Sequence, residues 1–193
     1  MANQMRPIAR NLKPPPLPKF VQESSKGARF SVAVLPFQSL KKVRISHYES
    51  GPFMFYIQIE SAEGEFQRFI AKLQKVELHH LKSRPTSLGM ACLARHDKKI
   101  YRAAIAKCPQ NPAHENFLVN FVDFGFNASV KLENLFYIPD EFLQFTFAMP
   151  FCLAGLKASE LKVNEKEIAF YFRQLTENRL VSLKCIAFDG EFD

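Results

Sequence analysis

Three phenylalanines within six residues are the side chains whose types and spacing most clearly suggest a binding chemistry. Phe121, Phe124 and Phe126 lie in the segment 117–132 (FLVNFVDFGFNASVKL), where alternating apolar residues and Gly125 predict two β-strands joined by a tight corner. Aromatic rings at such a corner either pack into a core or line a pocket whose ring faces attract a cation. The residue pattern alone is consistent with both interpretations.

The polar side chains do not form a catalytic or metal-binding group. Cys92 with His96, and Cys108 with His114, each lack the second pair of ligands that a tetrahedral zinc site needs. The acidic residues of 30–82 are not grouped with arginines as metal-assisted phosphodiester cleavage requires, and the sequence contains no GxSxG, P-loop or HExxH motif. We therefore expect no enzyme activity, no bound metal and no cofactor.

Positive charge is concentrated at the N-terminal end. The formal net charge is +7, but residues 1–30 hold six Lys or Arg against one Glu, so the rest of the chain carries only +2. A broad surface that follows a phosphate backbone is therefore not expected. A local basic patch at Lys41, Lys42 and Arg44 remains a candidate for nucleic-acid contact.

Hydrophobic residues make up 47% of the 193 residues, which predicts a folded globular chain of one well-cored domain or two small ones. No apolar run reaches the length of a membrane span, and the N-terminus lacks the apolar segment of a secretory signal. We expect a cytosolic or nuclear protein. The cysteines stand in apolar sequence without a CxxC pair, so we expect buried, reduced thiols at Cys92, Cys108, Cys152 and Cys185.

Residues 1–27 contain five of the twelve prolines, four of them in PPPLP at 14–18. This composition predicts a polyproline-prone basic tail or linker. Such a run also fits the aromatic grooves that bind proline-rich segments, but a solvated spacer is the favoured interpretation, since such runs are common at domain edges.

Short strands dominate the rest of the chain. Apolar alternation and turn residues predict strands at 30–35, 43–48, 53–59, 90–95, 100–108, 117–124, 129–132, 135–138, 151–156 and 180–188. The closely spaced strands between 90 and 138 are typical of a small, strongly bent barrel. We expect this barrel to be inserted into a second β-rich unit that is assembled from both ends of the chain.

Three helical segments are predicted. Residues 65–82 place apolar side chains at spacings of three and four, which indicates a helix with one buried face, and the helix ends before Pro85. Pro139 starts a short helical turn that continues to residue 145. Asn164 with Glu167 resembles a capping box, and it opens a helix with the expected buried residues Ile168, Tyr171, Phe172 and Leu175.

Four segments together resemble the Tudor domain. They are GMACLA at 89–94, IYRAAI at 100–105, VNFVDFG at 119–125 and LFYIP at 135–139, and they follow the family pattern G-x-x-C-x-A, W-Y-R-A-x-V, V-x-F-x-D-Y-G-N, L-x-x-L-P in order and spacing. The preceding strand pair and helix are similar to those of the extended form of the domain. The resemblance covers about residues 30–188.

The resemblance implies a mainly β fold with helices (α+β), in which a Tudor β-barrel at 86–143 is inserted in a staphylococcal-nuclease-like OB-fold unit made from 28–85 and 144–193. Extended Tudor domains belong to scaffold proteins of the germline piRNA gene-silencing pathway, in the cytoplasm and the perinuclear germ granule (nuage). They are protein-binding modules without enzyme activity. They recognise N-terminal arginine-rich peptides of Piwi-clade Argonaute proteins, commonly with symmetrically dimethylated arginine.

The family cage consists of four aromatic residues and an asparagine. By motif position these fall on His96, Tyr101, Phe121, Phe124 and Phe126. Histidine replaces the first aromatic residue, and Phe126 stands at the position of the asparagine, so Phe126 is a candidate to fill the cage itself. Asn127 follows one residue later, and it and Asp123 are candidate secondary contacts. Asp123 is equally well explained as a corner residue that binds backbone amides, and we expect Arg102 to pair on the barrel surface.

A methylated guanidinium remains cationic and is less hydrated, so each good ring contact contributes about 0.5–2 kcal/mol. A cage without its orienting amide prefers dimethylarginine less. The sequence thus predicts a peptide-binding module with weak or no dependence on arginine methylation, whose ligand lies in the cleft between barrel and nuclease-like unit. The alternatives are a dimethylarginine reader with a rearranged cage, an OB-like module for single-stranded RNA, and a purely structural module.

Overall fold

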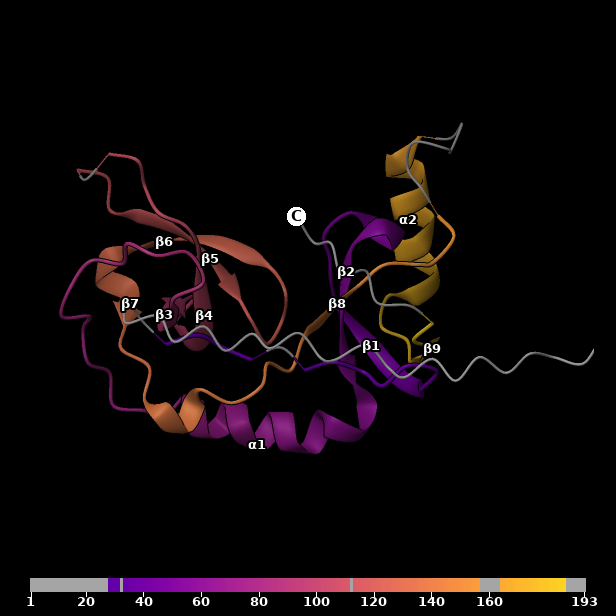
Figure 1. The fold of residues 1–193 in the computed structure, drawn as a ribbon, viewed down its shortest axis with the longest axis horizontal. Coiled ribbons are helices and arrows are strands. Elements are labelled where there is room, and N and C mark those ends of the chain that lie inside the picture. Colours follow the sequence, from indigo (N-terminus) through magenta and orange to yellow (C-terminus); the bar gives the residue numbers. More distant parts are fainter. Residues whose placement is uncertain (1–27, 32, 112, 157–163, 187–193) are drawn as a thin grey trace, which may run out of the picture.

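The computed structural model describes residues 28–31, 33–111, 113–156 and 164–186 (Figure 1). The predicted tail at 1–27 and the end of the last predicted strand, 187–188, lie outside these residues. Within them the strands form two antiparallel sheets, one of five strands in the order β6-β5-β4-β3-β7 and one of four in the order β8-β2-β1-β9. No helix in the described ranges combines the length and apolar composition of a membrane span.

The five-stranded sheet is the predicted barrel. Its strands are β3 (Ala91–His96), β4 (Lys99–Lys107), β5 (Asn116–Phe121), β6 (Asn127–Lys131) and β7 (Leu135–Phe136). Alternate side chains of β5, namely Phe117, Val119 and Phe121, are fully buried because successive residues of a strand face opposite sides of the sheet. Asp97 and Lys98 both have positive φ, as a two-residue hairpin between β3 and β4 requires.

The four-stranded sheet is built from segments that precede and follow the barrel in the sequence. β1 (Leu40–Tyr48) and β2 (Phe55–Ile59) precede the barrel, whereas β8 (Met149–Phe151) and β9 (Val181–Lys184) follow it. The predicted hairpin of β1 with β2 is confirmed. The expectation that the barrel interrupts a second β unit is thus met, and Figure 1 shows the two sheets side by side.

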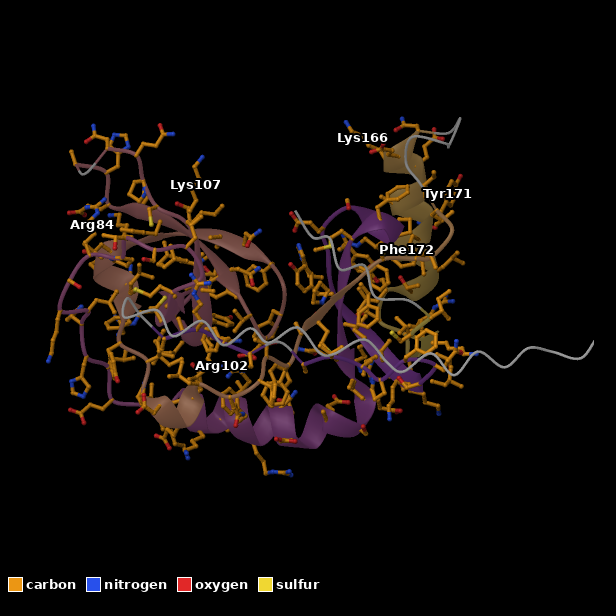
Figure 2. The ribbon with its side chains drawn as sticks, in the orientation of Figure 1. Arg84, Arg102, Lys107, Lys166, Tyr171 and Phe172 are labelled. Carbon is orange, nitrogen blue, oxygen red and sulfur yellow. The ribbon has the colours of Figure 1, made fainter. Side chains whose placement is uncertain are left out.

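α2 (Glu165–Thr176) packs on the four-stranded sheet. Its cap agrees with the sequence, since the Asn164 side chain accepts a hydrogen bond from the Lys166 backbone N–H at 3.0 Å. The Phe172 ring lies 5.1 Å from the Phe55 ring, whereas Tyr171 points outward and is 63% exposed (Figure 2). Leu175 is exposed as well, and Ile168 and Phe172 are only half-buried, so the predicted buried stripe is wrong for two residues and met only in part for the other two. The four-stranded sheet covers only a narrow face of this helix.

α1 (Glu63–Leu73) runs along both sheets and buries Phe66, Phe69 and Leu73. It ends at Leu73, well before the predicted end at residue 82. The Gln74 side chain exchanges two hydrogen bonds with the Ile100 backbone, at 2.8 and 2.9 Å. Beyond it, the carbonyl of His79 accepts from the Tyr137 N–H at 2.8 Å. Pairing with the barrel therefore takes this backbone out of the helix.

Several further expectations are corrected. The segment around 30–35 forms no strand in its described residues; it runs between the two units, where the Ala28 carbonyl accepts from the Ala91 N–H at 2.7 Å. The strand expected at 151–156 lies earlier, at β8, and the turn after Pro139 is confined to Asp140–Phe142. Cys152 is exposed and Cys108 half-buried.

The other two cysteines, Cys92 and Cys185, are buried as expected. Burial raises the pKa of the Cys92 thiol to about 12, so this sulfur stays protonated at neutral pH. It donates to the carbonyl of Ala103 on the neighbouring strand at 3.4 Å. Cys92 is therefore a packing residue of the barrel core.

Candidate functional site

The corner after β5 is closed by backbone hydrogen bonds. The Phe121 carbonyl accepts from the N–H groups of Phe124 and Gly125, at 3.0 and 2.8 Å, and the Phe121 N–H donates to the Phe126 carbonyl at 2.9 Å. Gly125 has φ +93°, which side chains rarely adopt, and a Cβ there would overlap the ring of Tyr56. Glycine is needed at this position for both reasons, and the corner turns the three phenylalanines toward one another.

All five predicted cage residues meet at this corner, and we call them together the aromatic corner: His96 from the end of β3, Tyr101 from β4, and Phe121, Phe124 and Phe126. The Phe126 ring touches each of the others, with centroid distances of 4.7 Å to Phe121, 6.2 Å to Phe124, 6.3 Å to His96 and 6.4 Å to Tyr101. Tyr101 also lies 4.8 Å from Phe121 and 5.5 Å from Phe124. The tertiary structure thus brings together every position expected from the motif.

The spacing of these rings decides what the aromatic corner can hold. A guanidinium between two ring faces needs about 3.5 Å on each side, hence about 7 Å between centroids. Every distance from Phe126 is shorter and falls in the range of direct ring contact. Phe121 is completely buried, while the other four are partly exposed. In this arrangement no cation fits between the Phe126 ring and any of the other four rings.

The tyrosines near the corner remain neutral at physiological pH. Burial, and then the nearby carboxylate of Asp97, raises the pKa of the Tyr101 phenol above its ordinary value. Burial and the carboxylate of Glu49 raise the pKa of Tyr56 in the same way. A neutral phenol keeps the ring electrostatics that attract a cation, and it adds no charge of its own.

Asn127 lies beside the corner and is bonded to the neighbouring strand. Its side chain is exposed, and its Oδ1 accepts a hydrogen bond from Asn120 Nδ2 at 3.0 Å. The same Asn120 nitrogen also lies 3.3 Å from the Gly125 carbonyl. The two asparagines therefore link β5 and β6 beside the corner, a role for Asn120 that sequence reasoning missed.

Arg102 and Asp123 form a buried ion pair behind the corner, and each is only 1% exposed. Arg102 Nε donates to Asp123 Oδ2 at 2.9 Å, and Arg102 Nη2 donates to Asp123 Oδ1. The expectation that Arg102 pairs on the surface is wrong, and Figure 2 shows it inside the molecule. The structural interpretation of Asp123 fits this geometry, because both carboxylate oxygens have internal partners.

The same pair holds the chain that leads from the barrel to β8. Arg102 also donates to the carbonyls of Phe142, Gln144 and Phe145 at 2.8–3.0 Å, and Asp123 Oδ1 accepts from the Phe147 N–H at 3.1 Å. Its guanidinium carbon lies 4.6 Å from the Phe69 ring centroid on α1. Every donor is used, which is the condition for a buried pair to be tolerated.

Residues of the four-stranded sheet complete the site, and the motif did not indicate them. Ser46 Oγ donates to the Phe124 carbonyl at 2.8 Å, and Gln58 Nε2 donates to the Asp123 carbonyl at 2.6 Å. The His47 ring lies 6.3 Å from Phe126 and 6.2 Å from Tyr56. In sequence these are ordinary strand residues, and only the docking of the two units shows that they hold the aromatic corner.

The fold and the site define a class of protein. A barrel inserted in a second β unit, with an aromatic cluster where the two meet, is a platform for recognition, and the described residues contain no group of three or more potential metal ligands. The chain belongs to the Tudor domain family, whose model matches residues 35–155. This family consists of binding modules without enzyme activity.

The chain is also similar to individual proteins with Tudor domains. Protein tudor of Drosophila melanogaster is 31% identical over 156 residues, which are 79% of this chain and 6% of that protein. The extended Tudor domain TD3 from mouse TDRD1, in complex with a MILI peptide containing dimethylarginine, has a TM-score of 0.71 and 19% identity, with 84% of this chain and 83% of that chain covered. The complex of Tudor with symmetrically dimethylated Aubergine has a TM-score of 0.56 and 23% identity, with 69% and 80% covered. The predicted extended Tudor fold, mainly β with helices, is confirmed.

Proposed function

We propose that this chain is a peptide-binding scaffold module for arginine-containing tails of Piwi-clade Argonaute proteins, and that it depends weakly or not at all on arginine methylation. Membership of the Tudor family and the peptide complexes of TDRD1 with MILI and of Tudor with Aubergine support the peptide class. The observation that carries the second half is the position of Phe126, whose ring lies 4.7–6.4 Å from the other four rings of the aromatic corner.

The physical reason is that a cage gains methyl selectivity from ring faces on several sides of one cation. Cation–π contacts contribute about 0.5–2 kcal/mol each only if the cation fits within about 6 Å of the ring centroids. Phe126 fills that space and supplies no amide oxygen to orient the guanidinium. A peptide therefore has to be held by apolar contacts and backbone pairing beside the aromatic corner rather than by a caged methylarginine.

In this proposal the units are the barrel at 86–143 and the nuclease-like unit at 28–85 and 144–193, and the peptide lies between them. The docked residues Ser46, His47 and Gln58 support this location, because they bring the second unit to the aromatic corner. The place of action would be the germ granule of the cytoplasm, as the similarity to Protein tudor and TDRD1 suggests. Imaging of the tagged protein in germ cells tests this assignment.

The decisive experiment is a calorimetric titration of the 193-residue chain with a Piwi-type N-terminal peptide that carries one arginine, unmodified or symmetrically dimethylated. We expect both forms to bind with dissociation constants less than tenfold apart, which corresponds to a difference below about 1.4 kcal/mol. A larger preference for the methylated form would refute the methylation-independent reading and leave peptide binding intact.

A dimethylarginine reader with a rearranged cage is the second candidate. The partial exposure of the Phe126 ring favours it, since a partly exposed side chain at a corner can change rotamer and free the space that its ring fills beside Phe121. The titration above distinguishes the two. Binding of single-stranded RNA predicts instead an affinity that falls steeply with salt, so a salt series with an unstructured oligonucleotide tests that alternative.

A further inference from the structure

The outer side of α2 carries large apolar side chains that the described residues leave exposed. None of the 12 residues of this helix is buried. Phe170, Tyr171 and Leu175 are 56%, 63% and 67% exposed, and we call these three residues the α2 face. Figure 2 shows Tyr171 and the sheet-facing Phe172 on different sides of the helix. Since helices in proteins are stabilised mainly by packing of their apolar side, such a face indicates an interaction surface.

The side chains of the α2 face suit one kind of ligand. The rings of Phe170 and Tyr171 lie 5.7 Å apart at an angle of 70°, so together they form an aromatic ridge. Glu167 is exposed and stands three and four positions before them, which places it on the same side of the helix. Proline-rich segments bind on aromatic side chains, and a carboxylate beside the rings favours a segment that carries basic residues.

The same chain contains a segment with this chemistry. Residues 14–18 read PPPLP, and Lys13 and Lys19 flank this proline run directly. Residues 1–27, which hold the run, carry five Lys or Arg against one Glu. α2 with its C-cap residue has the opposite balance, three Glu against one Lys and one Arg. The run and the α2 face therefore match in both apolar chemistry and charge.

The chain is also long enough for the two to meet. Ala28 is held at the barrel, where its carbonyl accepts from the Ala91 N–H at 2.7 Å, and Leu35 is buried in the core on which Phe172 of α2 packs. Ala28 and Leu35 are therefore at most about 24 Å apart, and the width of the helix adds about 10 Å. The proline run precedes Ala28 by 10–14 residues, so it reaches about 33–46 Å from there.

We propose that the proline run at 14–18 docks on the α2 face of the same chain. Proline rings pack on Phe170 and Tyr171, and a flanking lysine pairs with Glu167. A proline run loses little conformational freedom on binding, because its backbone is already restricted. Attachment to the same chain gives it an effective concentration on the order of 1 mM at the helix. Docking withholds the run from aromatic grooves of other proteins, and it does not involve the aromatic corner.

A single tryptophan tests this contact in the 193-residue chain. The sequence contains no Trp, so Tyr171→Trp places one fluorescent indole on the α2 face. We expect its quenching by acrylamide to rise roughly twofold or more when Pro15→Ala and Pro18→Ala disrupt the run, since a docked segment excludes solvent from the ring. Pro7→Ala with Gln22→Ala is the matched control in the tail and should change nothing. Equal quenching with the intact and the disrupted run would overturn the proposal.

The position of the indole has its own control. Tyr137 follows β7 of the barrel and is 53% exposed, close to the value for Tyr171. The indole of Tyr137→Trp should be quenched equally with the intact and the disrupted run. If quenching rose by the same factor at both positions, the run would affect the chain as a whole, and docking on α2 would be refuted.

Protein concentration separates the tail from a second copy of the chain as the occupant. Docking within one chain predicts that the protection of the Tyr171→Trp indole is the same at 1 μM and at 100 μM protein. Protection that increases with concentration, together with a dimer in sedimentation, would identify a second copy on the α2 face. That result would count against the proposal.

A second measurement leaves α2 unchanged, so it does not depend on the folding of the tryptophan variant. In the isotopically labelled chain, Pro15→Ala with Pro18→Ala should shift the backbone amides of residues 167–175 and leave those of the barrel strands in place. Cross-relaxation between the Leu17 methyl groups and the Tyr171 ring protons would show the contact directly. If the amides of α2 do not shift and no such cross-relaxation is found, the run does not dock there.

Discussion

The aromatic corner and the hollow of about 270 Å³ on the α1 side of the junction between the two units lie next to each other, yet they differ in how closely their side chains pack. At the corner the rings touch one another, and the backbone carbonyls of Asp123 and Phe124 accept hydrogen bonds from the second unit. In the hollow, which Phe66 and Phe145 line, the Phe145 side chain is 62% exposed. Close ring contacts thus pack the corner, whereas the hollow leaves an aromatic side chain in contact with solvent.

The buried pair behind the corner should show the largest effect. Arg102→Ala leaves Asp123 as an uncompensated buried charge and frees three carbonyls, so we expect a loss of about 3–5 kcal/mol in the free energy of unfolding, measured with urea. Lys107→Ala, at an exposed position on the same strand, is the control and should change little. A loss below about 1 kcal/mol for Arg102→Ala would mean that the pair does not hold the two units together.

The fit of the second unit against the corner is tested at Gly125. Gly125→Ala combines positive φ with overlap of the Tyr56 ring, and we expect a loss of about 2–4 kcal/mol in thermal or urea unfolding. Gly155→Ala is the matched control, since Gly155 has φ +78° and no atom within 4 Å of an added Cβ. It should lose only about 1–2 kcal/mol, from backbone strain. Equal losses at both positions would show that Tyr56 does not press on the corner.

The difference between a packed and an open cage is tested by Phe126→Asn. This change removes the ring from the centre of the corner and restores an amide, so we expect the preference for dimethylated over unmodified arginine to rise by about 0.5–2 kcal/mol in paired titrations. Phe126→Leu keeps the space filled with apolar atoms and should leave the ratio unchanged. An unchanged ratio in the asparagine variant would indicate that the peptide arginine does not enter the corner at all.

The smallest effect concerns alkaline pH. The pKa values of Tyr101 and Tyr56 are raised in the folded chain, so folding favours the neutral phenols. Their contribution to stability is complete below the ordinary tyrosine pKa and is lost as the pH rises through the raised values. Tyr101→Phe with Tyr56→Phe should therefore flatten the fall of stability above about pH 10. Ultraviolet titration of the phenolates gives the pKa values directly; ordinary values would contradict the burial of these rings.

Much of the fold was readable from local patterns. Strand alternation, the turn at Gly125 and the cap at Asn164 each depend on residues close together in sequence, and the structure confirms them. The end of α1 was missed, because the bonds of Gln74 and His79 go to barrel residues distant in the chain. The exposed face of α2 was missed because apolar periodicity marks a face but does not say how much of it a neighbouring sheet covers.

The sequence by itself determined the family and the residues that gather at the corner, because motif order and spacing survive in the chain without knowledge of its packing. Only the tertiary structure decided that Arg102 is buried, that Ser46, His47 and Gln58 support the corner, and that Phe126 touches every other ring. These are distances between atoms brought together from far along the chain. The free volume between rings and the partners of a charge depend on such distances. Only the folded structure therefore distinguishes a packed aromatic cluster from a site that can accept a cation.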